Sequence, residues 1–485
     1  MKEEMYIELA PDLKISRVLT GLWQIADLER DGNTLDPIET AKYMQPYVKA
    51  GLSTFDMADH YGSAEVIAGA FKNQIQGGDK AQMLTKWVPE PGKVSKETIR
   101  NAVEKALSRL QSEQLDLLQY HAWSYPDPVW LDTLFELQKL KEQGLIKHLG
   151  VTNFDAAHLR IALASGIQLV SNQVCYSLLD QRAGGEMKSV CEQYGVKLLA
   201  YGTLAGGFLS DKWLGKPEPK VDENFTWSQM KYKRFIDEAV SWSNFQNLLK
   251  TLKSIAKKHK VSIANIATKF ILSQSHVAGV IVGARLGQSQ HVDDNLQLFD
   301  IRLDEDDFNA IQEQLAGLNA IQGDCGDEYR KPPFLTASGD LSHHVNGFPA
   351  PYETKIAKNG HQLVVSGTYW EGMAGYSRAI KTGSTIKVSG TTATHGNLLI
   401  GGKDLKAQTH FILDKIEGAI LSLGGTLEDV DRTRIFVNDI NDWEPVARAH
   451  GERFKDIQPA NTLVGGKLVG AGYKVEIEAE ATIKS

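Results

Sequence analysis

Cysteine is scarce in this sequence, which has 485 residues and only three cysteines. Cys175, Cys191 and Cys325 are far apart and odd in number, and none belongs to a CxxC pair or a Cys/His ligand spacing. This scarcity excludes a disulfide framework and the usual zinc-binding motifs. We therefore expect reduced thiols in a cytoplasmic protein that holds no metal.

Long apolar runs and basic runs are also lacking. No stretch is long enough to span a bilayer, and the first residues, MKEEMYIELAPDLK, contain no basic region followed by an apolar one. The formal net charge is −7, and no Lys/Arg-rich run is interleaved with aromatic residues. The sequence thus predicts no signal peptide, no membrane span and no nucleic-acid partner. It leaves a small molecule as the expected substrate.

Short apolar runs and amphipathic segments alternate between about residues 18 and 315. The segment ETIRNAVEKALSRL places Ile99, Val103, Ala106, Leu107 and Leu110 on one helical stripe. Strands that alternate with helices in this way predict an α/β fold, a (β/α)8 TIM barrel rather than a doubly wound sheet. The expected strands are 18–23, 52–57, 82–87, 116–121, 146–152, 169–174, 196–201 and 279–284.

Two segments outside this alternation also have expected places. The N-terminal YIELAPDLKIS is expected to form a hairpin that closes the barrel floor. The long polar stretch 209–245 is expected to form a flap or an accessory helix over the site.

The pattern changes after residue 320. Segment 321–354 is rich in Gly, Pro, Ser and Asp and lacks periodicity, which is typical of a linker. The rest reads as strands and two helices, so we expect a barrel of residues 1–320 and a smaller α+β domain of residues 355–485. In this domain the expected strands are 362–367, 385–393, 432–439 and 473–483, and the expected helices are 405–425 and 441–457.

Four residues of different chemistry close or follow successive barrel strands. They are Asp56, Tyr61, Lys86 and His121. Because the carboxyl ends of barrel strands meet at one face, these side chains are expected to share one active site.

An acid, a phenol, an amine and an imidazole together favour carbonyl reduction over hydrolysis. A free phenol titrates near pH 10, and a neighbouring ammonium lowers that pKa. An acid paired with the lysine holds it in place and keeps it charged, so that Tyr61 becomes a usable general acid. His121 donates a hydrogen bond to the same carbonyl oxygen. The sequence also lacks a GxSxG elbow, a metal-ligand cluster and suitably placed paired carboxylates, which argues against the common hydrolases.

The motifs around these residues resemble the aldo-keto reductase family over residues 5–320. FDMADHYG carries Asp56 and Tyr61, TKW carries Lys86, and QYH carries His121. The resemblance implies NADPH as the cofactor, bound without a Rossmann motif, and no GxGxxG occurs in the sequence. It also implies that further residues contact NADPH: Asn153 and Gln173 at the nicotinamide carboxamide, Tyr201 stacked on its ring, and Gly283, Arg285, His291, Asp294 and Asn295 around the adenosine and its 2′-phosphate.

Three tryptophans lie at strand ends near the predicted site. They are Trp23, Trp87 and Trp123. Each has the size of a core residue, but together they are expected to form an aromatic wall around a small carbonyl substrate.

Residues 355–485 resemble the Rid family of enamine/imine deaminases, a family with a chorismate-mutase-like α+β fold. The matching segments include GYSRAIKTGSTIKVSGTTA and PANTLVGGKL. The resemblance implies a trimer with clefts between subunits, lined by Tyr376 and by Glu476, which would orient a water. Active members carry an arginine after Pro-Ala, whereas this sequence has Asn461, and a neutral amide does not supply the bidentate pair of a guanidinium.

The roles of the two parts therefore stay open at this point. The leading interpretation is an NADPH-dependent reductase of a small aldehyde or ketone, fused to a Rid-like module in a homo-oligomer. A second is a bifunctional protein, in which the Rid-like domain hydrolyses an enamine or imine and the barrel reduces the released carbonyl compound. A third makes the Rid-like domain a non-catalytic module for trimerisation or ligand sensing.

Overall fold

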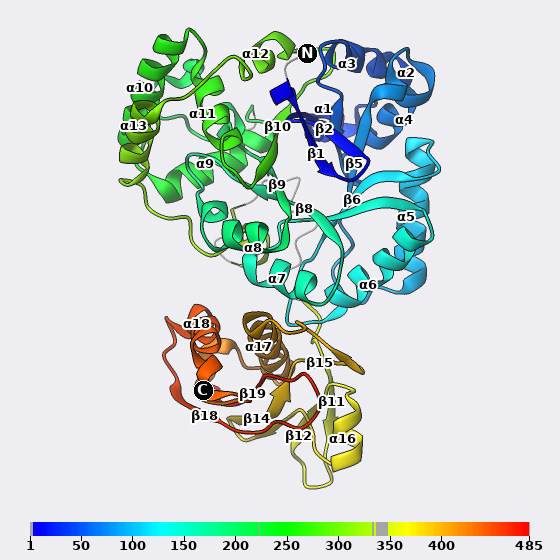
Figure 1. Cartoon of the computed structure of the whole chain (residues 1–485), viewed down its shortest axis with the longest axis vertical. Coiled ribbons are helices and arrows are strands. Elements are labelled where there is room, and N and C mark those ends of the chain that lie inside the picture. The colour runs from blue at the N-terminus through cyan, green and yellow to red at the C-terminus, as the bar shows by residue number, and fades with distance from the viewer. Residues whose placement is uncertain (1–2, 223, 332–333, 336–347, 485) are drawn as a thin grey trace.

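A computed structural model describes residues 3–222, 224–331, 334–335 and 348–484 (Figure 1). The N-terminal part is a closed barrel of eight parallel strands in the order β10-β3-β4-β5-β6-β7-β8-β9. This confirms the predicted (β/α)8 TIM barrel. The strands are β3 (Val18–Gly21), β4 (Thr54–Asp56), β5 (Gln82–Trp87), β6 (Leu115–His121), β7 (Ile146–Thr152), β8 (Leu169–Cys175), β9 (Lys197–Tyr201) and β10 (Val277–Gly283).

Helices cover the outside of the barrel, and α5 shows why they form. The Ser95 side chain caps its first turn by accepting a hydrogen bond from the backbone NH of Thr98. The stripe predicted from the sequence, from Ile99 to Leu110, is buried in the hydrophobic core, which stabilises the fold by about 1.5–3 kcal/mol for each large apolar side chain. The helices are α1 (Trp23–Glu29), α2 (Pro37–Ala41), α3 (Gln45–Lys49), α4 (Ala64–Gln74), α5 (Lys96–Leu110), α6 (Val129–Glu142), α7 (Ala156–Ala164), α8 (Glu186–Tyr194), α9 (Trp227–Ala239), α10 (Trp242–His259), α11 (Ile263–Leu272), α12 (Val292–Gln297), α13 (Glu305–Leu315) and α14 (Asp327–Arg330).

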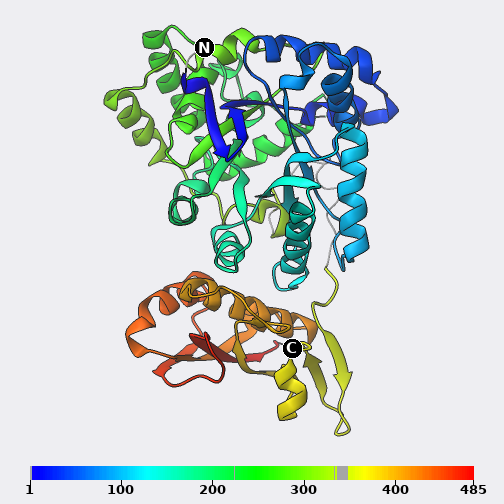
Figure 2. The ribbon, with the colours of Figure 1, turned by 45° about the vertical axis from the view of Figure 1, so that its right-hand side comes forward.

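A β-hairpin closes the floor of the barrel, as the sequence predicted. It is made of β1 (Tyr6–Ala10) and β2 (Leu13–Ser16), and it crosses the barrel opening in Figure 2. Leu13 and Ile15 of β2 belong to a buried cluster with Leu19, Leu84 and Leu117 of the barrel strands. The inside of the barrel is therefore a packed core at this end, which leaves the opposite end for chemistry.

The C-terminal part is a separate seven-stranded sheet in the order β11-β12-β13-β14-β19-β17-β18. Two helices, α17 (Leu405–Ser422) and α18 (Trp443–Phe454), cover one face of the sheet, and α17 packs against α7 of the barrel (Figures 1 and 2). This confirms the predicted α+β domain. The strands are β11 (Glu353–Ile356), β12 (Gln362–Val365), β13 (Ala379–Thr382), β14 (Thr385–Thr392), β17 (Val430–Val437), β18 (Ala460–Gly465) and β19 (Val475–Thr482). Smaller elements are α16 (Tyr369–Ala374), β15 (Thr394–His395) and β16 (Leu398–Leu399).

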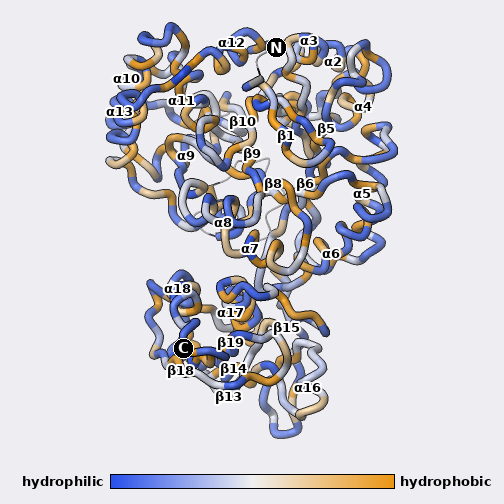
Figure 3. The backbone as a smooth tube through the Cα atoms, in the orientation of Figure 1, coloured by the Kyte–Doolittle hydropathy of each residue, from blue (hydrophilic) through white to orange (hydrophobic). Residues whose placement is uncertain are grey.

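Hydrophobic residues follow the strands and the inner sides of the helices, whereas hydrophilic residues follow the turns (Figure 3). Strands that break this rule were not predicted from the sequence. In β11 every residue is exposed, and β18 is exposed except at Leu463. Neither carries the alternation of a half-buried strand. Among the described residues, no helix is both long enough and apolar enough to cross a membrane.

Part of the segment that was expected to be a linker folds onto the barrel. Cys325 is buried there, together with Asp327, Glu328 and Tyr329 of α14. Arg182 Nη2 of the barrel donates to Glu328 Oε2 at 2.9 Å, with both side chains buried. The segment is held by such ion pairs and by isolated buried side chains, Ile321, Cys325 and Leu335, whose spacing forms no apolar stripe, so its sequence shows no periodicity. Residues 336–347, also in the expected linker, lie outside the described residues.

Candidate active site

A cavity of about 680 Å³ opens at the carboxyl ends of the barrel strands. This volume is typical of a site for a small molecule or cofactor. Its lining takes at least one residue from the end of each of the eight strands: Gly21, Asp56, Lys86, His121, Thr152, Gln173, Tyr201 and Gly283.

The four residues predicted to do the chemistry all line this cavity. Lys86 Nζ of β5 donates to Asp56 Oδ2 of β4 at 2.7 Å. The same Nζ lies 5.0 Å from the ring centroid of Tyr61, which follows β4. His121 ends β6. The structure thus brings an ammonium, a carboxylate, a phenol and an imidazole together at one mouth.

The ion pair of Lys86 and Asp56 is almost dry, since each side chain is 4 % exposed. Burial lowers the pKa of Lys86, and the nearby Asp56 carboxylate opposes this by favouring the charged ammonium. The positive charge beside Tyr61 therefore depends on Asp56.

Asp56 is itself held by two amide side chains. Gln173 Nε2 of β8 donates to Asp56 Oδ1 at 2.7 Å and to Gln119 Oε1 at 3.0 Å. Gln119 Nε2 lies 3.4 Å from the same Asp56 oxygen. The sequence analysis missed Gln119, although its place two residues before His121 puts both side chains on the inner face of β6.

Aromatic rings surround the mouth beside the tetrad. The ring centroids of Trp23 and Tyr61 are 4.8 Å apart, and those of His121 and Trp123 are 4.5 Å apart. Trp227 of α9 extends this wall, with its centroid 5.7 Å from that of Trp23. Since α9 starts inside the predicted flap 209–245 and lines the cavity, the accessory helix is confirmed.

The prediction for Trp87 needs correction. Trp87 does not line the cavity, and its ring packs against Tyr120 in the buried core with centroids 5.8 Å apart. Successive residues of a strand point to opposite faces. Because Lys86 points into the barrel, Trp87 points outward to the helices.

The residues expected to contact the cofactor line the same cavity. Tyr201 Oη donates to Asn153 Oδ1 at 2.7 Å. Asn153 adopts a left-handed backbone with φ of 58°, and its NH donates to Gln173 O at 2.8 Å. The cavity also includes Gly283, Arg285, His291, Asp294 and Asn295 at the end of β10 and the start of α12.

Arg285 is already paired in this part of the cavity. Its guanidinium contacts the buried Asp27 carboxylate of α1, and its Nε lies 3.4 Å from Gln24 Oε1. Asp27 also accepts from Arg30 Nη1 at 3.3 Å. Arg285, which the family resemblance assigned to the 2′-phosphate, therefore already pairs with the Asp27 carboxylate.

Among the polar residues that line the cavity and were not found from the sequence are Lys231, Tyr329 and Lys212. Lys231 Nζ of α9 donates to Tyr329 Oη of α14 at 2.5 Å and lies 5.2 Å from the ring centroid of Tyr201. Lys231 and Lys212 lie in the long polar stretch, and Tyr329 lies in the expected linker, so no strand end marked them in advance.

The residues assigned to the Rid-like cleft are only partly together within one chain. Arg378 Nη2 donates to Tyr376 Oη at 3.0 Å, and Arg378 Nη1 donates to Gly390 O at 2.9 Å. Glu476 packs so closely on Gly390 that a Cβ there would lie 2.1 Å from its Oε1. Burial raises the pKa of Glu476, and Arg378 opposes this. Tyr376 and Glu476 thus both lie near the Arg378 guanidinium.

Asn461 lies elsewhere in the same sheet. It is on β18, which β17 separates from β19, the strand that carries Glu476. Its Nδ2 donates to Thr433 Oγ1 at 2.9 Å. Within one chain Asn461 therefore belongs to a different part of the surface from Tyr376 and Glu476.

Comparisons with known proteins agree with this architecture. Residues 17–316 match the family model described as Aldo/keto reductase family, and residues 350–483 match the one described as Endoribonuclease L-PSP. A soybean (Glycine max) relative, "Probable aldo-keto reductase 1", is 28% identical over 61% of this chain and 82% of its own. The glycerol dehydrogenase AKR11B4 of Gluconobacter oxydans has a TM-score of 0.54 and 24% identity over 65% of this chain and 96% of its own.

The C-terminal part has a solved relative of its own. Rv2704 of Mycobacterium tuberculosis, a member of the YjgF/YER057c/UK114 family, is 40% identical, covers 25% of this chain and 99% of its own, and has a TM-score of 0.24. The aldo/keto reductase family model covers well over half of the chain. The chain therefore belongs to the aldo/keto reductase family, and it carries a C-terminal domain of the Endoribonuclease L-PSP (Rid) type.

Proposed function

We propose that the barrel catalyses NADPH-dependent reduction of a small aldehyde or ketone. One observation carries the proposal: the dry Lys86–Asp56 pair lies beside the Tyr61 ring in a cavity shared with Asn153 and Tyr201. Family membership supports an oxidoreductase. The particular carbonyl substrate is left to experiment.

The residues of the cavity suit a nicotinamide cofactor. Asn153 and Gln173 offer amide groups beside the Tyr201 ring, and Lys212 and Arg285, which line the same cavity, offer cations for phosphates. Bound NADPH supplies a hydride to the carbonyl carbon.

The chain supplies the proton and the charge stabilisation. Tyr61 donates its hydroxyl proton to the carbonyl oxygen as the hydride adds to the carbon, so that an alcohol and a phenolate result. The Lys86 ammonium stabilises the phenolate, and Asp56 keeps that ammonium charged. His121 donates a hydrogen bond to the developing oxyanion. The rings of Trp23 and Trp123 exclude water from the reacting carbonyl.

The direct test is a screen of small aldehydes, ketones and 2-imino acids with the full-length protein. Consumption of NADPH and release of ammonia are followed in parallel. The proposal expects NADPH consumption with at least one carbonyl class. Consumption with none of them, by a folded protein, would contradict it.

For the C-terminal domain, the proposal is assembly into a trimer in the cytoplasm, with ligand binding in the clefts, rather than hydrolysis of 2-imino acids. Asn461 stands where a carboxylate clamp needs a guanidinium, and its amide is bonded to Thr433. Apolar side chains near β18 are exposed, including Trp443 at 52% and Val464 at 41%. The bifunctional alternative requires ammonia release in the same screen. The proposed domain limits remain 1–320, 321–354 and 355–485.

A further inference from the structure

Arg330 joins the ends of two barrel strands at the active site. It is the last residue of α14, in the segment that follows the barrel. Its Nε donates to Ala122 O at 3.0 Å, and its Nη2 donates to Asn153 O at 2.5 Å. Ala122 comes directly after His121. One guanidinium therefore fixes the backbone beside the imidazole and the backbone of the residue proposed to hold the carboxamide.

The chain passes so close to Asn153 and Arg330 at position 326 that only a glycine fits there. Gly326 has φ of 81°, and a Cβ on it would lie 2.0 Å from Asn153 O and 2.5 Å from Arg330 Nη1. Asn153 itself has a left-handed backbone, a conformation that persists only where neighbouring groups hold it. Arg330 and Gly326 are two of those neighbours.

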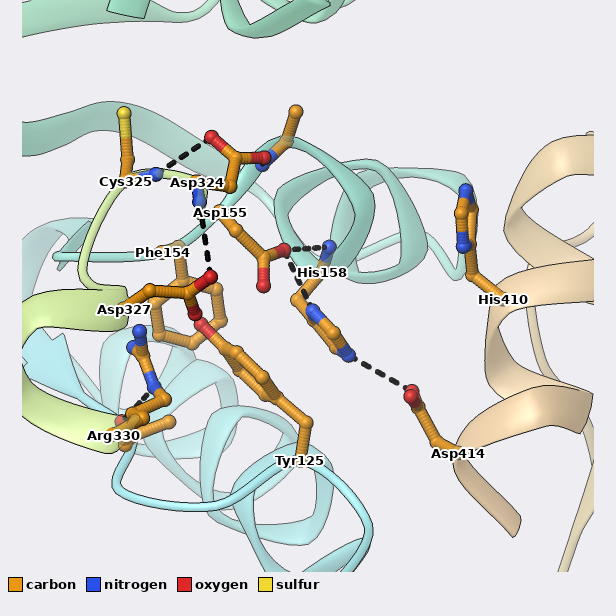
Figure 4. A network of polar contacts seen from close by, with 12 residues as sticks. Tyr125, Phe154, Asp155, His158, Asp324, Cys325, Asp327, Arg330, His410 and Asp414 are labelled. Carbon is orange, nitrogen blue, oxygen red and sulfur yellow. Dashed lines mark hydrogen bonds and ion pairs between the residues drawn. The ribbon is translucent and has the colours of Figure 1, made fainter. Parts of the chain in front are cut away.

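The far side of the guanidinium rests on a stack that leads to the C-terminal domain (Figure 4). Arg330 Cζ lies 4.5 Å from the ring centroid of Tyr125, and Tyr125 stacks on His158 with centroids 3.4 Å apart. His158 Nδ1 bonds Asp155 at 2.6 Å, and its Nε2 bonds Asp414 Oδ2 of α17 at 2.9 Å. The two domains thus meet on a buried layer that touches Arg330.

We propose that Arg330 is a positioning residue of the reductase, acting through Asn153 and the backbone after His121, and that Asp414 of the Rid-like domain stabilises the Tyr125–His158 stack on which it rests. The inference rests on the proposed function for its link to NADPH. It gives the C-terminal domain a part in shaping the cofactor site. The planar guanidinium of Arg330 holds two carbonyl oxygens at once, those of Ala122 and Asn153, and a lysine ammonium does not offer this fixed geometry.

The first test compares full-length wild type with Arg330→Met and Arg330→Lys. Hydrogen exchange of the backbone amides of residues 121–125 and 152–158 is measured without any cofactor. We expect exchange to be about tenfold faster or more in Arg330→Met, in keeping with loss of charge-assisted bonds of about 1.5–3 kcal/mol, and intermediate in Arg330→Lys. Unchanged exchange in both variants would overturn the positioning role.

NADPH binding, followed by fluorescence titration, gives the second readout. Arg330→Met is expected to weaken binding by about tenfold, with KM for NADPH rising more than kcat falls. If wild type binds no NADPH, the proposed function fails, while the exchange experiment still decides the role of Arg330. If Arg330→Met does not fold, Arg330→Lys and the interdomain variants decide instead.

A matched pair of variants tests the share of the C-terminal domain. Asp414→Asn removes the charge that faces His158. Asp404→Asn removes a charge of the same interface, which bonds Arg160 Nη1 of α7 at 2.9 Å and touches no member of the stack. We expect Asp414→Asn to raise both the exchange rate of residues 121–125 and 152–158 and the Kd for NADPH by about threefold to tenfold, because charge-assisted bonds are lost, and Asp404→Asn to change neither. Equal effects of the two variants would overturn the part assigned to Asp414.

Discussion

Lys86 Nζ and Asp56 Oδ2 lie 2.7 Å apart on neighbouring parallel strands, with each side chain only 4 % exposed. A buried pair of this kind is costly to desolvate and adds little to stability relative to apolar residues. Because the pair lies beside Tyr61, we assign it the role of keeping a positive charge next to the phenol rather than that of stabilising the fold. The predictions below begin from this pair.

Asp56→Asn is expected to move the alkaline limb of the kcat profile to lower pH. Burial lowers the pKa of Lys86, and Asp56 is the largest influence that raises it. Without that carboxylate the lysine loses its proton at a lower pH, and kcat falls from there upward. Steady-state kinetics between about pH 6 and about pH 11 check this, because that range brackets the ordinary lysine pKa of about 10.4. If the alkaline limb of the variant's kcat profile stayed at the wild-type pH, Asp56 would not be what keeps Lys86 charged.

Asp27→Asn is expected to increase the preference for NADPH over NADH. The substitution releases the Arg285 guanidinium from its carboxylate partner, so that it gains by pairing with a 2′-phosphate. The preference should rise by about tenfold or more, because a hydrogen bond to a charged group is worth about 1.5–3 kcal/mol. Dissociation constants for both cofactors give the ratio. Asp31→Asn is the control, since the Asp31 side chain is 86% exposed and its carboxylate lies 3.9 Å from Arg30 Nε. An equal shift in that variant would remove Arg285 from the explanation.

The interdomain layer is expected to weaken as the pH rises above neutrality. Although burial opposes it, the Asp155 and Asp414 carboxylates raise the pKa of His158 to about 9, above its ordinary value. Arg330 and Arg453 face the same layer and stay charged, and Tyr125 stays neutral because burial raises its pKa. The stability due to His158 is therefore complete below about pH 6.5, the ordinary value, and is lost as the pH rises through about 9.

Calorimetry of wild type and His158→Gln checks this window. The apparent Tm of wild type should fall more steeply than that of the variant between about pH 6.5 and about pH 9. The difference in the free energy of unfolding should change with a slope that approaches about 1.4 kcal/mol per pH unit for one proton, at about 25 °C. Parallel curves for the two proteins would show that His158 does not carry the charge.

The oligomer is expected to come apart when charge is placed near β18. Trp443→Asp and Val464→Asp each put a carboxylate on an exposed apolar side chain of the C-terminal domain, where a subunit contact would have to desolvate it. Mass photometry should show smaller species for both variants and an unchanged assembly for Tyr43→Asp on the barrel, where Tyr43 is 44% exposed. A wild type that is already monomeric would contradict the proposed trimer.

The sequence predicted those parts of the fold whose strands combine apolar runs with clear ends. The barrel strands, the floor hairpin and the α5 stripe were predicted in this way. The strand β18 was missed because its residues are nearly all exposed, and α14 was missed because ion pairs rather than an apolar face hold it.

The residues of the candidate site likewise fall into those that the sequence predicted and those that it did not. Asp56, Lys86 and His121 were predictable because a barrel brings its strand ends together. Tyr329 and Arg330 reach the cavity or its rim from a chain segment whose position depends on tertiary contacts, so spacing alone did not reveal them. Trp87 was assigned to the wrong face because the alternation of strand residues was not applied next to Lys86.

The most direct measurement of the central claim compares Tyr61→Phe with wild type on a carbonyl substrate found in the screen. The substitution removes only the phenolic hydroxyl group, so kcat should fall by about 10²–10⁴-fold, as for loss of a general acid. The Kd for NADPH, measured by fluorescence titration, should stay unchanged. A Tyr61→Phe variant that turns over like wild type would contradict the claim that this phenol, beside Lys86, protonates the carbonyl oxygen.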